Sequence, residues 1–123
     1  MVERLRTSNA ASFTAAHRLR AKPQFDLLYR KGRRINDPNF LVLALANDLP
    51  HARLGLSISA KAVGNAVNRN RVKRTIRESF RRNLQRLRNI DIVVNARNSA
   101  RNASNPALTH SLEQLWDKLA RHA

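Results

Sequence analysis

Runs and alternations of hydrophobic residues predict the strands of this chain. Residues 40–46 are apolar throughout, which is typical of a strand buried on both faces. Residues 53–59 alternate between large apolar side chains and small or polar ones, so one face of that strand should meet the core. Residues 91–97 alternate in a similar way, and a further short strand is expected near Arg34.

Capping residues and helical spacing predict helices between these strands. Pro23 suits the first turn of a short helix, and Gly32 suits its end. A long helix is expected over residues 66–87. It follows a loop at residues 60–65, whose Gly-Asn pair is able to take positive φ.

The last helix completes the predicted architecture. A polar loop is expected at residues 98–105, with Asn105 as the N-cap and Pro106 as the first residue of a leucine-rich helix. The elements predict an α+β fold, a single domain with three helices on a mostly antiparallel sheet of about four strands. Residues 1–16 are expected to form a flexible N-terminal extension, and residues 17–123 the folded domain.

The charge balance narrows the class of partner. The chain has 24 Lys and Arg against 8 Asp and Glu, a net charge of +16, and 19 of the basic residues are arginine. Such a protein attracts polyanions, and the arginine side chain grips phosphate and stacks on bases. A membrane surface is the competing polyanion, but a helix that binds it carries Trp, Phe and Leu opposite its charges, and the chain has only six aromatic residues. No apolar run is long enough to span a bilayer.

The basic charge is concentrated on the predicted long helix. At 100° per residue, Val72, Ile76 and Phe80 fall on one side of that helix. The opposite side gathers polar and basic residues: Asn70, Lys73, Arg74, Arg77 and Arg81. Like charges four residues apart destabilise an isolated helix, and a bound polyanion relieves that repulsion. Because a merely soluble surface normally mixes both signs, this side predicts nucleic-acid binding.

No arrangement of residues for nucleolytic catalysis stands out. The chain has no cysteine, and its four histidines lack the spacing of metal ligands. Two-metal phosphodiester cleavage needs converging carboxylates, and the eight available form no motif. Asp26 on a helix and Asp91 at a strand start are expected to be solvated or turn residues. The residues alone therefore predict a nucleic-acid-binding protein in which no nucleolytic motif can be recognised.

The basic segment carries a long spaced motif, Lys61-x-x-Gly64-Asn65-Ala66-x-x-Arg69-Asn70-Arg71-x-Lys73-Arg74-x-x-Arg77-Glu78-x-Phe80. This spacing resembles the signature of the bacterial ribonuclease P protein family, and the resemblance covers about residues 17–120. It implies a parallel pair of strands, 53–59 and 91–97, joined by a left-handed crossover around the basic helix. General packing rules favour the opposite hand.

The resemblance also implies partners and a division of labour. The catalytic RNA subunit of ribonuclease P would contact Lys61, Asn65, Arg69, Asn70, Arg71, Lys73, Arg74 and Arg77. That RNA would hold Mg²⁺ and cut the 5′ leader from precursor tRNA, and the protein would hold no metal. The protein would act in the cytoplasm, as a subunit of an endoribonuclease.

A second surface is expected to bind the single-stranded 5′ leader. By the resemblance, Phe25 and Tyr29 match aromatic positions beside a cleft, and aromatic stacking tolerates any base. The full set of expected leader contacts is Phe25, Tyr29, Arg53, Ser57, Phe13 and Arg18. Leu43 stands where some family members carry another aromatic residue. The alternative is that Phe25 and Tyr29 are simply core residues.

Two other classes of protein fit part of the pattern. A structural RNA-binding protein, such as a ribosomal protein, accounts for the charge but not for the motif from Lys61 to Phe80. A DNA-binding helix-turn-helix protein needs a partner helix and a tight turn before its recognition helix, and here a strand and a loop are expected instead.

Overall fold

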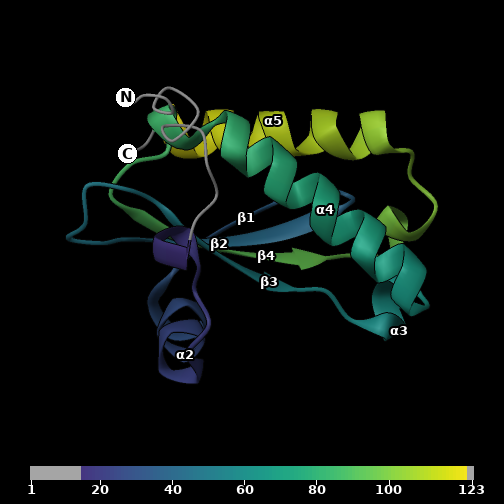
Figure 1. The fold of residues 1–123 in the computed structure, drawn as a ribbon, viewed down its shortest axis with the longest axis horizontal. Coiled ribbons are helices and arrows are strands. Elements are labelled where there is room, and N and C mark those ends of the chain that lie inside the picture. The colour runs from purple at the N-terminus through teal and green to yellow at the C-terminus, as the bar shows by residue number, and fades with distance from the viewer. Residues whose placement is uncertain (1–14, 122–123) are drawn as a thin grey trace, which may run out of the picture.

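The computed structural model describes residues 15–121, and the fold is α+β (Figure 1). Its elements are η1 (Ala15–His17), α2 (Lys22–Lys31), β1 (Arg33–Asn36), β2 (Phe40–Ala46), β3 (Arg53–Ser57), α3 (Ala60–Val63), α4 (Ala66–Arg82), η2 (Leu84–Arg86), β4 (Ile90–Ala96), η3 (Asn98–Arg101) and α5 (Asn105–Arg121). Residues 1–14, most of the expected N-terminal extension, lie outside the described part. The expected strand near Arg34 is β1, at the edge of the sheet.

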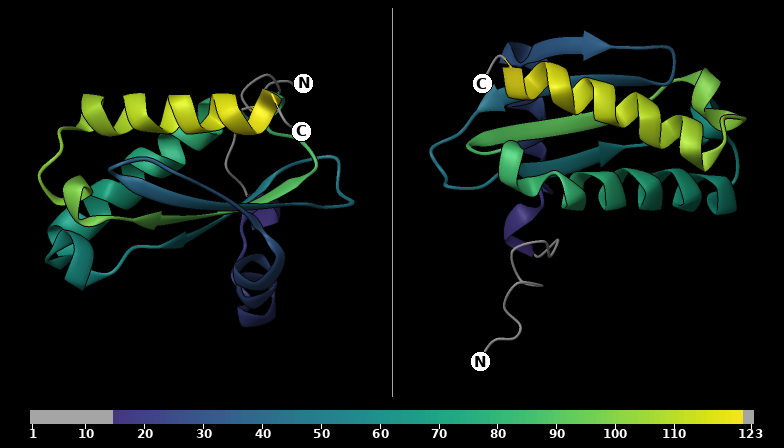
Figure 2. Two further views of the ribbon diagram at one scale, coloured as in Figure 1. Left: turned by 180° about the vertical axis from the view of Figure 1, so that it is seen from behind. Right: turned by 90° about the horizontal axis from the view of Figure 1, so that it is seen from above.

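The four strands form one mixed sheet in the order β1-β2-β4-β3. The pairs β1/β2 and β2/β4 are antiparallel, whereas β3 and β4 run parallel. The chain passes through α3 and α4 on its way from β3 to β4. Viewed from the α4 side with both parallel strands pointing upward, β4 lies to the left of β3 (Figure 2, right). The crossover is therefore left-handed, as the resemblance implied and against the usual preference.

Helices cover both faces of the sheet. α4 and α5 lie on one face and α2 on the other (Figure 1). Toward α4 and α5 the strands contribute side chains such as Val42 and Ile92 to the main core, where Trp116 and Phe80 meet edge to face at 6.1 Å. The Trp116 indole nitrogen donates to the Ser79 hydroxyl at 2.8 Å, which satisfies its buried N–H. A smaller cluster, which includes Leu28 and Leu43, joins α2 to the other face.

Two predicted loops contain helical turns. The loop expected at 60–65 begins with α3, because the Ser59 hydroxyl accepts from the Ala62 N–H and starts a turn. Gly64 has the expected positive φ, at 96°, but Asn65 does not: its φ is −70°, and its side chain caps α4 instead. The polar loop after β4 contains the 3₁₀ turn η3.

The ends of the two long helices also differ from the prediction. α4 ends at Arg82 rather than at residue 87. The next residue, Asn83, donates hydrogen bonds from its side-chain amide to the Ser79 carbonyl and to the Glu113 carboxylate. α5 is capped by Ser104, whose hydroxyl accepts from the Ala107 N–H, so the expected cap Asn105 is already a helical residue. No helix among residues 15–121 has the length and hydropathy needed to cross a membrane.

Candidate nucleic-acid interface

The start of α4 is fixed by side chains that bind backbone groups. Asn65 accepts from the Asn68 N–H at 3.0 Å, and the Asn68 amide donates to the Val63 and Arg101 carbonyls. Beside this turn the Arg101 guanidinium lies against Gly64, where a Cβ atom would come within 3.3 Å of it. The first turn of the basic helix is therefore held in place by α3 and by the segment around η3.

Arg71 points toward the 100–105 segment rather than outward. Its guanidinium donates to the Asn68 side chain at 2.8 Å, to the Ala103 carbonyl at 2.9 Å and to the Asn105 side chain at 2.8 Å. Longer hydrogen bonds reach the carbonyls of residues 100 and 101, at 3.4 and 3.3 Å. Arg71, an expected RNA contact, thus already donates its hydrogen bonds to the segment before α5.

Three cations of α4 keep their charge available at the surface. Arg74 and Arg77 are exposed and Lys73 is half-buried. Within residues 15–121, none of the three forms an ion pair. Burial, followed by the nearby charge of Arg18, lowers the pKa of Arg77, which still carries its proton at neutral pH. This surface, Lys73, Arg74 and Arg77, is called the cationic face below.

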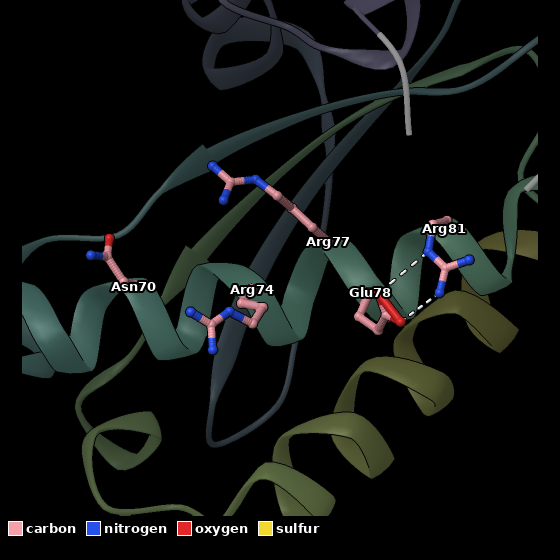
Figure 3. Close-up of a pocket in the computed structure, with 5 residues that line it drawn as sticks. All are labelled: Asn70, Arg74, Arg77, Glu78 and Arg81. Carbon is pink, nitrogen blue, oxygen red and sulfur yellow. Dashed lines mark hydrogen bonds and ion pairs between the residues drawn. The ribbon is translucent and has the colours of Figure 1, made fainter. Parts of the chain in front are cut away.

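A hollow of about 390 Å³ opens beside these residues and is lined by Asn70, Arg74, Arg77, Glu78 and Arg81 (Figure 3). Of the lining residues, Glu78 is the acidic one, and its carboxylate lies 2.5 Å from the Arg81 guanidinium and 3.6 Å from that of Arg82. The hydrogen bond from Arg81 lowers the pKa of Glu78, which keeps that carboxylate charged. The positive charge of α4 is therefore partly neutralised beyond residue 78 and unneutralised before it.

The other expected contacts with the catalytic RNA divide into two groups. Lys61 on α3 and Asn70 on α4 are exposed, and Asn70 lines the same hollow as Arg74 and Arg77. Arg69 is half-buried, and its Nε atom is buried without a hydrogen-bond partner. Asn65, like Arg71, is used within the fold, as the cap of α4.

The Phe25 ring packs against the face of β3 that carries small side chains, at Gly55. A Cβ atom on Gly55 would lie 2.6 Å from the tip of the Phe25 ring, so only glycine lets the ring lie this close to the strand. Phe25 is half-buried and borders a second hollow, of about 340 Å³. The lining of that hollow is Arg18, Leu19, Arg20, Phe25, Leu54, Leu56, Lys73 and Arg77. The expected RNA and leader surfaces therefore meet at this hollow.

Tyr29 lies four residues further along α2, with 39% of its surface exposed. Its hydroxyl donates to the Asn95 side chain at 2.5 Å. Ser57 is exposed and pairs in register with Asn95 across β3 and β4. The exposure of Tyr29 leaves its ring accessible, whereas Leu43 is fully buried beneath α2 and offers no stacking surface.

Arg53 makes a bidentate ion pair with Asp91, with both nitrogen–oxygen distances at 2.8 Å. These hydrogen bonds raise the pKa of Arg53. The expectation that Asp91 is a solvated or turn residue is wrong: only 8% of it is exposed, and Asn47 also donates to its carboxylate at 2.7 Å. Two donors of Arg53 are thus committed within the sheet.

The two remaining expected leader contacts come from the N-terminal segment. Arg18 is exposed and forms a bridge to Leu54 of β3, beside the second hollow. Phe13 lies outside the described residues.

Carboxylates and histidines do not converge on a metal site in the part of the chain that the structure describes. Among residues 15–121, no three of these side chains come together in a way that suits a metal ion. The acidic side chains instead bind neighbouring groups: Lys22 holds Asp26, and Arg86 holds Glu113 and Asp117. The described residues therefore offer no cluster of carboxylates that would hold Mg²⁺.

Comparisons with known proteins find relatives that match most of this chain. The family model for ribonuclease P matches residues 13–120. The ribonuclease P protein component of Vibrio campbellii is 39% identical over 92% of this chain and 96% of that protein. The corresponding protein of Pseudoalteromonas atlantica is 41% identical, over 89% and 92% of the two chains.

Solved structures give the same result for the fold. The RNase P protein of Staphylococcus aureus has a TM-score of 0.79 and 35% identity, covering 83% of this chain and 94% of that one. The RNase P protein of Thermotoga maritima has a TM-score of 0.75 and 31% identity, covering 82% and 96%. Each of these proteins therefore shares both the fold and a recognisable part of the sequence.

Proposed function

The chain belongs to the ribonuclease P protein family, and from that membership we propose that its two surfaces bind two RNAs. The cationic face of α4 binds the catalytic RNA subunit of ribonuclease P. The hollow beside Phe25, together with the exposed Tyr29, binds the 5′ leader of precursor tRNA. In this way the protein assists the endonucleolytic removal of the leader, in the cytoplasm.

The observation that carries this proposal is the position of Lys73 and Arg77. They form no ion pair within residues 15–121, and they line the same hollow as the half-buried Phe25. Cations neutralise phosphates, while an aromatic ring stacks on a base without reading its identity. An aromatic side chain beside unpaired cations suits a single strand of any sequence.

The catalytic step is proposed to belong to the RNA subunit. Mg²⁺, when held by that RNA, would supply the activation of water and the stabilisation of charge that phosphodiester cleavage needs. The residues of this chain bind and orient: the cationic face positions the protein on the RNA, and α2 holds the leader. This division is supported by the acidic side chains: among residues 15–121, five of the seven are engaged in ion pairs, and none lines the hollow beside Phe25.

Reconstitution tests this division of labour. The purified protein alone is expected to leave precursor tRNA intact, because its described carboxylates and histidines form no cluster that could hold a catalytic metal ion. Added to the catalytic RNA at low Mg²⁺, it is expected to restore cleavage at the mature 5′ end, measured by gel electrophoresis of labelled substrate. Cleavage by a nuclease-free preparation of the protein alone would refute the proposal. Failure to stimulate the RNA would favour a structural RNA-binding protein, such as a ribosomal protein.

The leader surface is tested by replacing Phe25 and Tyr29 with alanine. Because stacking contributes about 1–3 kcal/mol per base, the reconstituted enzyme should lose about tenfold or more of its preference for leader-bearing over mature tRNA. The readout is the ratio of the two dissociation constants. Affinity for the catalytic RNA, measured in parallel, should change little. An unchanged ratio would exclude both rings from the leader site.

A further inference from the structure

The aromatic surface of α2 is joined to the centre of the sheet by one hydrogen bond. The Tyr29 hydroxyl donates to the Asn95 side-chain oxygen at 2.5 Å, across 66 residues of sequence. Tyr29 has 39% of its surface exposed, so the ring reaches solvent while its hydroxyl is held at the other end. The hydrogen bond therefore restricts a side chain that helix packing alone leaves accessible.

Asn95 is itself held at a defined place. It lies near the end of β4, an interior strand of the sheet, and is half-buried. In register it pairs with Leu41 of β2 on one side and Ser57 of β3 on the other. Its amide nitrogen donates to the Leu41 carbonyl at 3.3 Å, which turns its oxygen toward Tyr29. The acceptor is thus oriented by the sheet before any ligand arrives.

We propose that Asn95 is a positioning residue for the leader, which fixes the Tyr29 ring as a preformed stacking surface. The inference rests on the proposed function, because it presumes that a base of the leader stacks on Tyr29. A freely rotating ring must be ordered when the base binds, and this cost weakens binding. Asn95 removes part of that cost in the free protein.

The same hydrogen bond contributes little to folding. A tyrosine hydroxyl that reaches solvent exchanges its protein partner for water at small cost. The burial of α2 depends instead on Leu28, which is fully buried against Leu43 and Val93. Loss of the hydrogen bond should therefore affect leader binding more than stability, which separates a positioning role from a structural one.

A double-mutant cycle on the reconstituted enzyme tests this assignment. The variants are Tyr29→Phe, which keeps the ring and removes the donor, Asn95→Ala, which removes the acceptor, and the two combined. Each single variant should lower the preference for leader-bearing over mature tRNA by about three- to tenfold. The double variant should lose no more than either single one, because both remove the same hydrogen bond.

The controls decide between the possible outcomes. Asn36→Ala, in the edge strand β1, is the matched control and should leave the ratio unchanged. Melting temperature and affinity for the catalytic RNA should stay close to those of the parent protein in every variant. If Tyr29→Phe and Asn95→Ala leave the ratio unchanged, or if their effects add, the positioning role is refuted. A fall in the ratio that follows the melting temperature also refutes it.

Failure of the inference is distinguishable from failure of the proposed function. If replacing both Phe25 and Tyr29 by alanine lowers the leader preference while Tyr29→Phe and Asn95→Ala do not, the leader site stands and Asn95 has no part in it. If none of these variants changes the ratio, the leader site itself is refuted, and the positioning role with it.

Discussion

Replacement of Lys73, Arg74 and Arg77 by alanine is expected to weaken binding of the catalytic RNA by about a hundredfold or more. Each of these side chains is free of an ion pair within the described residues, so each is available for a phosphate. Hydrogen bonds to charged groups contribute about 1.5–3 kcal/mol each, although neighbouring contacts do not add fully. Filter binding at several salt concentrations gives both the affinity and its salt dependence.

The salt dependence separates a local contact from a general charge effect. Loss of three phosphate contacts should reduce the slope of log affinity against log salt by about 2–3. The matched control replaces Lys22, Lys118 and Arg121, which are exposed on α2 and α5 and carry the same total charge. If this control weakened binding as strongly, net charge rather than the cationic face would govern the interaction.

Arg71→Ala is expected to lower the free energy of unfolding by about 2–4 kcal/mol. The change removes hydrogen bonds to the Asn68 and Asn105 side chains and leaves carbonyls of the 100–103 segment without this donor. For a domain of this size, the melting temperature should fall by roughly 10 °C or more, measured by circular dichroism.

Arg71→Lys provides the sharper comparison. Lysine keeps the charge but lacks the planar fork that serves several acceptors at once, so it should recover only part of the lost stability. A surface contact with RNA would behave differently, because the lysine would preserve most of the affinity and the melting temperature would hardly change. A stable Arg71→Ala variant with weak RNA binding would therefore contradict the structural role assigned here.

The hydrophobic pattern predicted the three longer strands and the two long helices well, because each of them buries a continuous face. Phe40–Ala46 was located from its composition alone, and most of that strand is buried, with α5 packed on one face of the sheet and α2 on the other. Element ends were predicted less well. The end of α4 depends on Asn83 reaching Glu113, and the end of the loop before α5 depends on Ser104. Such tertiary hydrogen bonds leave no periodic signal in the sequence.

The sequence predicted which residue types form the candidate site, but not which of their side chains bind other parts of the chain. The motif gave the cations of α4, yet it did not separate Arg71, which binds the chain itself, from Arg74, which faces solvent. The partner of Arg53 was accessible in principle, because parallel neighbouring strands that begin together place Arg53 beside Asp91. The link from Tyr29 to Asn95 was not, since it depends on how α2 crosses the sheet.

Lys73 and Arg77 line the hollow that Phe25 borders, and under the proposed function this shared lining would couple the two RNAs. A leader strand beside Phe25 and a catalytic RNA on α4 would lie within about one Debye length of the same two charges, so neither polyanion meets them independently. Thermodynamic linkage then requires that each RNA change the affinity of the protein for the other by the same factor. At the edge of β3, binding of the substrate leader would thus change how tightly the protein holds the catalytic RNA in the assembled ribonucleoprotein.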